Sequence, residues 1–189
     1  MDILCGIDEA GRGPLAGDLV MAGCILHKKV AGLNDSKKLS AKKREILFSA
    51  IINNASYHIA KFSAQDIDNN GISVCLKKGL EEIMENLTAQ KYLFDGNQTY
   101  GMKNLETMVQ ADGKIAEVSA ASILAKVIHD KDIIALAKKY PQYQFEKHKG
   151  YGTKLHVEMI KKYGYCEIHR KTYKIKALEA TLFADNSLT

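Results

Sequence analysis

The chain has 189 residues, 46% of them hydrophobic and 26% charged, which is enough apolar material for a folded core and excludes a disordered chain. Its 27 Lys and Arg residues against 22 Asp and Glu give a formal net charge of +5, too small for a histone-like polycation. The four cysteines include no C-x-x-C pair, which excludes a zinc ribbon and argues against a disulfide scaffold. The sequence shows neither a basic leader nor an apolar run of membrane-helix length, so we expect a soluble, cytoplasmic protein.

The first half of the chain alternates short apolar runs with helical patterns. The apolar runs predict three strands, at residues 3–7, 19–27 and 57–63. The first strand is expected to end at Asp8 and to pair antiparallel with the second. Helical periodicity predicts two helices, at residues 40–53, with Ser40 as its N-cap, and at residues 72–87.

The second half continues the alternation. Residues 91–94 and 105–111 predict two strands, which the turns at Asp95-Gly96-Asn97 and Asp112-Gly113 end. Residues 116–140 predict a long helix whose first half is rich in small residues, which allows a close approach to a neighbouring element. One face of this helix carries Val118, Ala121, Ser122, Ala125, Ile128 and His129. The whole pattern predicts an α/β fold with a mixed central sheet flanked by helices.

Positive charge is concentrated near the C-terminus. Residues 138–176 contain eleven Lys or Arg residues against three acidic ones, together with six of the nine tyrosines. A solvated helical face would account for most of these residues taken singly. The asymmetry of the block favours a polyanion with stackable bases, hence nucleic acid, over a membrane surface.

Acidic residues follow three of the apolar runs. Asp8-Glu9, Asp95 and Asp112 each precede a glycine-containing turn, and neighbouring strand ends bring such residues to one edge of a sheet. Taken alone, each of the last two is better explained as an ordinary turn, whereas two adjacent acids after a strand, as at Asp8-Glu9, are an unusual way to make one. Gathered carboxylates repel unless they share protons or bind a cation, and an all-oxygen set selects Mg²⁺ or Mn²⁺ over zinc. Two such ions would suit phosphodiester hydrolysis.

The glycines after Asp8-Glu9 do not form a nucleotide-binding fingerprint. Their spacing is G-x-G-x-x-x-G, and no Gly-Lys-Ser/Thr follows, which argues against a nucleotide cofactor. Gly11 and Gly13 instead allow the backbone to approach another molecule closely, and Arg12 has the reach and charge for a phosphate.

Over residues 3–180 these features resemble the ribonuclease HII family, the type 2 ribonucleases H of bacteria. Four segments carry the resemblance in order: residues 8–13 (DEAGRG), 34–40 (NDSKKLS), 120–127 (AASILAKV) and 148–153 (HKGYGT). The resemblance implies a ribonuclease H-like fold with a helical C-terminal part. It also implies endonucleolytic cutting of RNA in RNA/DNA duplexes, including incision 5′ to single ribonucleotides embedded in DNA.

The resemblance also implies roles for individual residues. The family's four acidic metal ligands fall on Asp8, Glu9, Asp95 and Asp112. Its glycine-arginine-glycine motif, which reads the ribose 2′-OH and phosphates, falls on Gly11, Arg12 and Gly13. Its stacking tyrosine falls on Tyr151. Lys37 and Lys38 would contact phosphate, although on the sequence alone a solvated lysine pair is equally consistent.

Three positions depart from the family pattern. Asp18 stands where the family usually has proline, Ala111 where glycine is common, and His129 where arginine is frequent. We expect His129 to be a histidine on the helix surface. For Asp130 on the same helix, an outer-shell carboxylate and a solvent-facing residue are both open.

We predict that the four acids bind two divalent ions, Mg²⁺ or Mn²⁺, around the scissile phosphate, leaving 5′-phosphate and 3′-hydroxyl ends. The substrate would be an RNA/DNA hybrid or a ribonucleotide-containing duplex, bound by a monomer whose residues 1–189 form one domain with a basic helical segment from about residue 138. A type 3 ribonuclease H that prefers longer hybrids is the enzymatic alternative, although that family usually carries an N-terminal binding domain and only seven residues precede Asp8. The second alternative is a module that binds RNA/DNA hybrids without cutting them.

Overall fold

The structure, a computed structural model, describes residues 3–175. Its centre is a five-stranded sheet of order β3-β2-β1-β4-β5. The strands are β1 (Leu4–Ala10), β2 (Leu19–Leu26), β3 (Ala55–Phe62), β4 (Lys91–Asp95) and β5 (Leu105–Met108). β1, β2 and β3 pair antiparallel, whereas β4 pairs parallel with both β1 and β5. The predicted mixed sheet is therefore confirmed.

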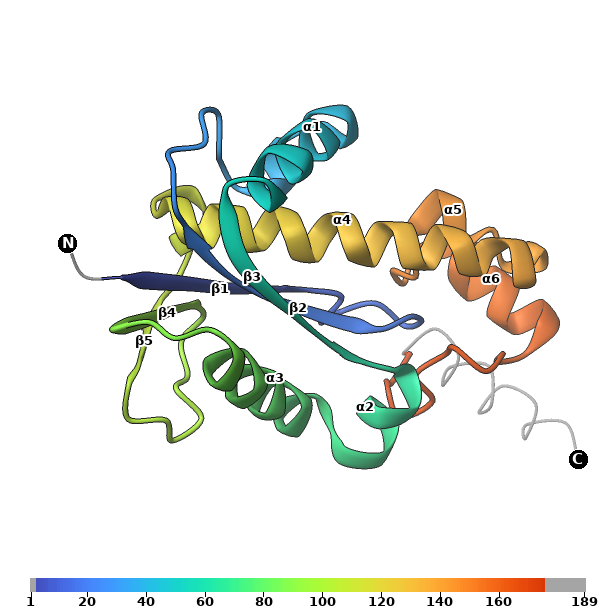
Figure 1. Ribbon diagram of the computed structural model, residues 1–189. Helices are drawn as coiled ribbons and strands as arrows, with labels where there is room; N and C mark the ends of the chain where they lie inside the picture. Colours follow the sequence, from blue (N-terminus) through green and yellow to red (C-terminus); the bar gives the residue numbers. More distant parts are fainter. Residues whose placement is uncertain (1–2, 176–189) are drawn as a thin grey trace, which may run out of the picture.

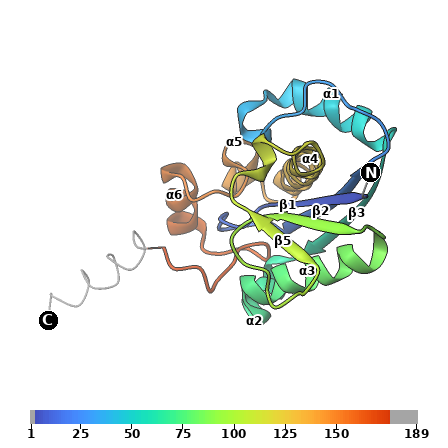
Figure 2. The same cartoon turned by 90° about the vertical axis from the view of Figure 1, so that its left-hand side faces the viewer.

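Helices cover both faces of the sheet (Figure 1). On one face lie α4 (Ala116–Lys139) and α1 (Ala41–Ile52), and on the other lie α2 (Ala64–Asn70) and α3 (Ile72–Asn86); Figure 2 shows the three layers end-on. Side chains of β1 alternate between the layers, so that Ile7 packs with the α3 side and Ala10 with the α4 side. Within residues 3–175, no helix has both the length and the apolar character that a bilayer crossing requires.

The first half of α4 lies directly against β1. Ala120, Ala121 and Ala125 are fully buried there, and a Cβ built on Gly6 of β1 would lie only 2.3 Å from the backbone of Glu117. The close approach predicted from the small residues of this helix is thus present. It fixes the N-terminal end of α4 relative to β1.

Two predicted strand ends are wrong. β1 continues through Asp8 and Glu9 to Ala10, because these acids stay in the ladder opposite Ala22 and Met21 of β2. β5 ends at Met108, three residues earlier than predicted, and the left-handed backbone of Gln110 (φ 58°) turns the chain out of the sheet. Asp112 consequently lies in a 3₁₀ turn, η2 (Ala111–Gly113), rather than at the tip of a strand.

The described C-terminal residues form a small lobe at the far end of α4 (Figure 1). It contains η3 (Pro141–Tyr143), α5 (Phe145–His148) and α6 (Lys154–Tyr163). Its centre holds three buried histidines: His148 stacks on His156 at 4.2 Å between ring centroids, and His156 Nε2 lies 3.0 Å from His169 Nε2. The predicted basic segment extends to residue 189, but its part from residue 176 onward lies outside the described residues. The single-domain organisation of the whole chain therefore stays a prediction.

The buried histidines predict a pH dependence of stability. Burial lowers the pKa of His156 and of His169 to about 4, whereas an unfolded histidine titrates at about 6.5. Between these values the unfolded chain binds protons that the folded chain does not. The stability that these histidines contribute is therefore complete above pH 6.5 and is lost as the pH falls to about 4.

The check compares the unfolding free energies of the wild type and His156→Gln between about pH 7.5 and 4.5. Titrating groups that do not contact His156 are common to both proteins and cancel in the difference, which therefore reports on His156 and the two histidines packed against it. The advantage of the wild type should shrink by about 2 kcal/mol as the pH falls. A difference that stays constant across this range would contradict a histidine that is neutral in the fold.

Candidate functional site

Three carboxylates from distant parts of the chain meet at one edge of the sheet. One oxygen of each of Asp8, Asp95 and Asp112 lies within 4.8 Å of the other two. The parallel pairing of β1 with β4 sets Ile7 beside Phe94, which places the next residues, Asp8 and Asp95, side by side. The Ser119 hydroxyl of α4 donates to the Asp112 carbonyl and holds η2 against them.

Glu9, the fourth predicted acid, does not belong to this compact group. Glu9 follows Asp8 on β1 and lines the same groove, but it brings no oxygen into the group of three that lie within 4.8 Å of one another. Its carboxylate lies 3.7 Å from the Arg12 guanidinium. Its Oε2 atom is buried and has no hydrogen-bond partner among the described residues. Glu9 is therefore a neighbour of the group with unused ligand capacity.

The carboxylates are held at an electrostatic cost. Burial raises the pKa of Asp8 well above its usual range, and the Glu9 charge raises it further. Burial together with the charge of Asp95 raises the pKa of Asp112 to about 6, and burial raises that of Glu9 to about 7. These raised values come first from burial and then from neighbouring negative charge, and a bound cation would offset both. An all-oxygen set with an unpartnered buried oxygen fits a hard divalent cation.

Lys37 is the cation that faces this cluster. Burial disfavours its charge, yet the surrounding carboxylates, first those of Asp8 and Asp112, raise its pKa. Its neighbour Lys38 has a side chain that is 67% exposed and lies 3.9 Å from Asp35. Lys38 lines the hollow that also contains Asp95 and Asp112, so both predicted lysines lie near the acids.

Sequence reasoning did not find the residues that hold the segment carrying Lys37. Arg44 of α1 donates to the carbonyls of Ser36 (2.9 Å) and Leu39 (2.7 Å), and the Ser36 hydroxyl lies 2.8 Å from that of Ser122 on α4. Ser122 in turn hydrogen-bonds Asp8. The capped helix that contains Arg44 was predicted, but no pattern in the sequence connects it to this loop.

The two glycines of the predicted substrate loop differ in their structural need. Gly11 has φ +88°, and a Cβ there would lie 2.4 Å from the Asp18 carbonyl oxygen, so only glycine fits. At Gly13, no atom of the described residues lies within 4 Å of such a Cβ. The fold itself therefore requires Gly11 but not Gly13.

Tyr151, in the C-terminal lobe, borders a groove that also contains Asp8 and the Gly11–Gly13 loop. Its ring is 41% exposed, and Lys126 of α4 lies 5.6 Å from the ring centroid. The groove has a volume of about 510 Å³. The residues that line it are Asp8, Glu9, Ala10, Gly11, Arg12, Gly13, Ser36, Lys37, Ser122, Lys126 and Tyr151. Seven of the ten predicted site residues therefore share one groove, while Asp95, Asp112 and Lys38 line the adjoining hollow.

The prediction for His129 is wrong. Instead of lying on the helix surface, His129 is 1% exposed, because its ring packs against the backbone of Gly11, where no side chain intervenes. Its Nδ1 lies 3.2 Å from Asp130, and Asp130 also accepts a hydrogen bond from Lys126 (2.8 Å). The Asp130 side chain is only 16% exposed, so it is not solvent-facing; its role as an outer-shell carboxylate stays a prediction.

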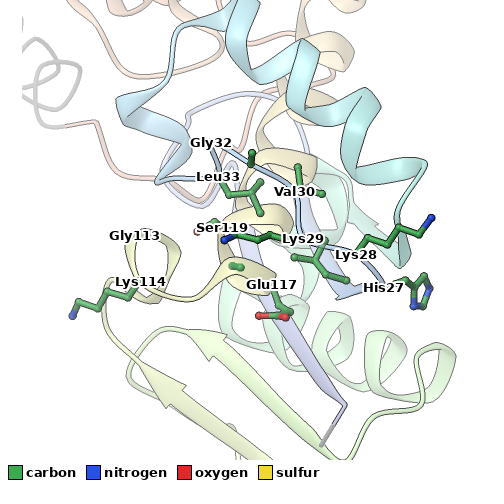
Figure 3. Close-up of a pocket in the computed structure, with 13 residues that line it drawn as sticks. His27, Lys28, Lys29, Val30, Gly32, Leu33, Gly113, Lys114, Glu117 and Ser119 are labelled. Carbon is green, nitrogen blue, oxygen red and sulfur yellow. The ribbon is translucent and has the colours of Figure 1, made fainter. Parts of the chain in front are cut away.

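A second cavity of similar size, about 520 Å³, lies behind the turn that carries Asp112 (Figure 3). Its walls come from residues 26–33 and from the start of α4, and Lys28 and Lys114 point outwards on opposite sides of it. Glu117 is its one acidic lining residue. Among the described residues it contains no group of carboxylates, unlike the edge of the sheet at Asp8.

Comparison with known proteins gives consistent matches. The family described as Ribonuclease HII matches residues 5–176. A curated ribonuclease HII from Sulfurovum sp. (strain NBC37-1) is 60% identical over 181 residues, which cover 95% of this chain and 96% of that protein.

Solved structures agree on the fold. The ribonuclease HII in the complex with PCNA from Archaeoglobus fulgidus aligns with a TM-score of 0.80 at 27% identity, over 92% of this chain and 96% of that chain. Bst-RNase HIII in complex with Mn²⁺ aligns with a TM-score of 0.72 at 16% identity, over 97% of this chain and 70% of that chain, which is a likeness of fold alone. The predicted ribonuclease H-like fold is confirmed.

Proposed function

The chain belongs to the ribonuclease HII family and is a ribonuclease H, and from this premise we propose its substrate and mechanism. It hydrolyses the RNA strand of RNA/DNA hybrids and incises 5′ to single ribonucleotides embedded in duplex DNA. It leaves 5′-phosphate and 3′-hydroxyl ends. The observation that carries the proposal is the meeting of Asp8, Asp95 and Asp112 beside a groove bordered by Arg12 and Tyr151.

We assign the three clustered carboxylates and Glu9 to two divalent ions, Mg²⁺ or Mn²⁺. When bound, such ions activate a water molecule and stabilise the leaving oxygen in phosphodiester hydrolysis. Asp8, Asp95 and Asp112 offer oxygens close enough to share a cation, and Glu9 contributes its unpartnered Oε2 from the side. Ser122 and Ser119 keep Asp8 and Asp112 in place. The Mn²⁺ complex of a protein with this fold is consistent with the assignment.

Recognition of RNA must involve the ribose 2′-OH, the group that distinguishes it from DNA. The backbone of Gly11 and Gly13 allows the sugar to come close, and Arg12, whose side chain is 53% exposed beside Glu9, reaches a phosphate. The exposed ring of Tyr151 offers a surface on which a sugar stacks. Lys37 lies beside the cluster as a phosphate contact, and Lys38 extends the positive surface outwards.

Replacing each of the two loop glycines with alanine distinguishes an effect on folding from an effect on substrate recognition. Gly13→Ala meets no neighbour and should fold like the wild type, yet its methyl group enters the space proposed for the ribose. We expect kcat/KM on a duplex with one ribonucleotide to fall at least about tenfold, with an unchanged melting midpoint. Gly11→Ala should lower the melting midpoint as well, because its Cβ meets the Asp18 carbonyl. Wild-type kcat/KM in a folded Gly13→Ala variant would contradict the assignment of this loop.

The proposal is tested with three duplexes of one sequence: all DNA, DNA with a single ribonucleotide, and an RNA/DNA hybrid. The metal is removed with a chelator and restored with Mg²⁺ or Mn²⁺. We expect cutting of the second and third duplexes only after metal is restored, with the cut 5′ to the single ribonucleotide and with 5′-phosphate ends.

Two outcomes would favour the alternatives. Cutting of the hybrid without cutting at the single ribonucleotide would favour a type 3 preference. Salt-dependent binding without any metal-dependent cutting would favour a hybrid-binding module, although clustered acids would repel the phosphates in that case. The monomeric state and the cytoplasmic location stay predictions, which light scattering and cell fractionation test.

A further inference from the structure

Arg170 is a buried arginine that the proposed chemistry does not use. It is 1% exposed and lies far along the sequence from the loop that it contacts. Its Nη2 donates to the carbonyls of Gly11 (2.5 Å) and Gly17 (2.8 Å), and its Nη1 donates to that of Arg12 (3.1 Å). The planar guanidinium group of Arg170 therefore hydrogen-bonds to both ends of the loop that carries Gly11, Arg12 and Gly13.

Tyr173 completes this contact. Its hydroxyl donates to the Arg12 carbonyl at 2.8 Å and accepts from Arg170 Nη1 at 3.2 Å. The carbonyl of Arg12 thus receives two hydrogen bonds from the C-terminal segment. The peptide on which the Arg12 side chain is mounted is held by residues that lie outside the groove.

His169, the residue before Arg170, is connected through His156 to Tyr151 on the other side of the groove. His169 Nδ1 accepts from the Cys166 backbone N–H at 2.9 Å, so its Nε2 carries the proton and donates to His156 Nε2 at 3.0 Å. His156 Nδ1 then donates to the Tyr151 carbonyl at 3.0 Å. A single set of tautomers satisfies all three contacts and fixes the backbone of Tyr151.

Main-chain hydrogen bonds join residues 168–170 to the loop that follows Gly13, and join that loop to the residue before Tyr151. Gly17 N–H donates to Ile168 (2.9 Å), Arg170 N–H donates to Leu15 (2.8 Å), and Leu15 N–H donates to Gly150 (2.8 Å). The far end of this C-terminal segment is anchored on α2, where Asp68 accepts from the backbone of Lys171 (2.8 Å) and of Thr172 (3.0 Å).

We propose that residues 168–173 form a brace that sets the spacing between the Gly11–Gly13 loop and Tyr151, with Arg170 and Tyr173 as positioning residues for ribose recognition. The inference rests on the proposed function and adds the residues that determine its specificity. The brace contacts the backbone of the recognition elements and none of the clustered carboxylates. Its loss should therefore weaken the selection of ribonucleotides and leave metal binding unchanged.

The test uses the full chain with Tyr173→Phe and Arg170→Lys, and Tyr163→Phe as the matched control. Tyr173→Phe removes one hydroxyl, and Arg170→Lys keeps the charge but loses the fork. Tyr163 is an exposed tyrosine of the same lobe that does not line the groove. The readouts are kcat and KM on a duplex with one ribonucleotide, affinity for that duplex and for all-DNA duplex in the presence of Ca²⁺, Mn²⁺ affinity of the protein alone, and the melting midpoint.

We expect Tyr173→Phe to raise KM about three- to tenfold, the effect of one or two lost hydrogen bonds, and Arg170→Lys to raise it about 10- to 100-fold. In both variants kcat should change less than KM, Mn²⁺ affinity should match the wild type, and the preference for the ribonucleotide duplex should fall. Tyr163→Phe should resemble the wild type in every readout.

Wild-type KM and duplex preference in folded Tyr173→Phe and Arg170→Lys would overturn the brace, as would a loss of activity that parallels a loss of Mn²⁺ affinity. If Arg170→Lys does not fold, Tyr173→Phe decides alone. Failure of the proposed function has a different signature, since the wild type itself would then not cut the single-ribonucleotide duplex. The Ca²⁺ binding preference would still report on the brace in that case.

Discussion

Asp8→Asn should lower the cleavage rate at least about 1,000-fold, while affinity for the duplex stays within about threefold of the wild type. Asp8 lies on β1 at the centre of the carboxylate group and receives a hydrogen bond from Ser122. Asparagine keeps the size of the side chain but removes the charge that a divalent ion requires. The contacts proposed between the duplex and Arg12 and Tyr151 do not depend on that charge. Single-turnover cleavage and a binding titration in Ca²⁺ measure the two effects separately.

The matched control for this prediction is Glu85→Gln, the same loss of charge at an exposed position on α3. It should leave both the rate and the affinity unchanged. Wild-type cleavage by Asp8→Asn would remove Asp8 from the chemistry. A loss of duplex affinity as large as the loss of rate would instead place it in substrate binding.

Gly6→Ala should destabilise the protein by about 3 kcal/mol or more, the cost of overpacking a site that cannot relax. The new Cβ would lie 2.3 Å from the backbone of Glu117 and of Val118, and no side-chain rotation relieves a contact with backbone. The start of α4 would have to move away from β1. Because α4 follows η2 directly, the same movement would separate Asp112 from Asp8. We expect the melting midpoint to fall by about 10 °C and the activity of the folded fraction to fall with it.

Gly13→Ala is the control for the thermal measurement, since its Cβ has open space around it. A melting midpoint for Gly6→Ala within about 2 °C of the wild type would show that α4 does not rest on β1 as closely as described.

Local patterns predicted most of the fold because each signal acts over a few residues. The helix α1 begins after Ser40, whose side chain accepts from the Lys43 N–H, as its sequence predicts. The helix α2 was missed because it is short and polar. Its start is set by a capping box between Ser63 and Asp66, which has aspartate where the usual pattern has glutamate or glutamine.

The candidate site was predictable to the extent that it depends on residue type. Carboxylates after apolar runs indicated that Asp8, Asp95 and Asp112 would converge, and they lie together. What the pattern could not show was their local backbone, because the end of β5 depends on the left-handed turn at Gln110. The burial of His129 depends on Gly11, and the role of Arg170 depends on carbonyls more than 150 positions away. Such contacts exist only once the chain has folded.

The most direct test of the central claim is anomalous diffraction from crystals of the protein with Mn²⁺ and a non-cleavable duplex that contains one ribonucleotide. The account predicts two anomalous peaks, bounded by Asp8, Asp95 and Asp112 with Glu9 at the side, next to the phosphate on the 5′ side of the ribose. Crystals of protein that cleaves in Mn²⁺ but shows no peak in contact with these carboxylates would contradict it.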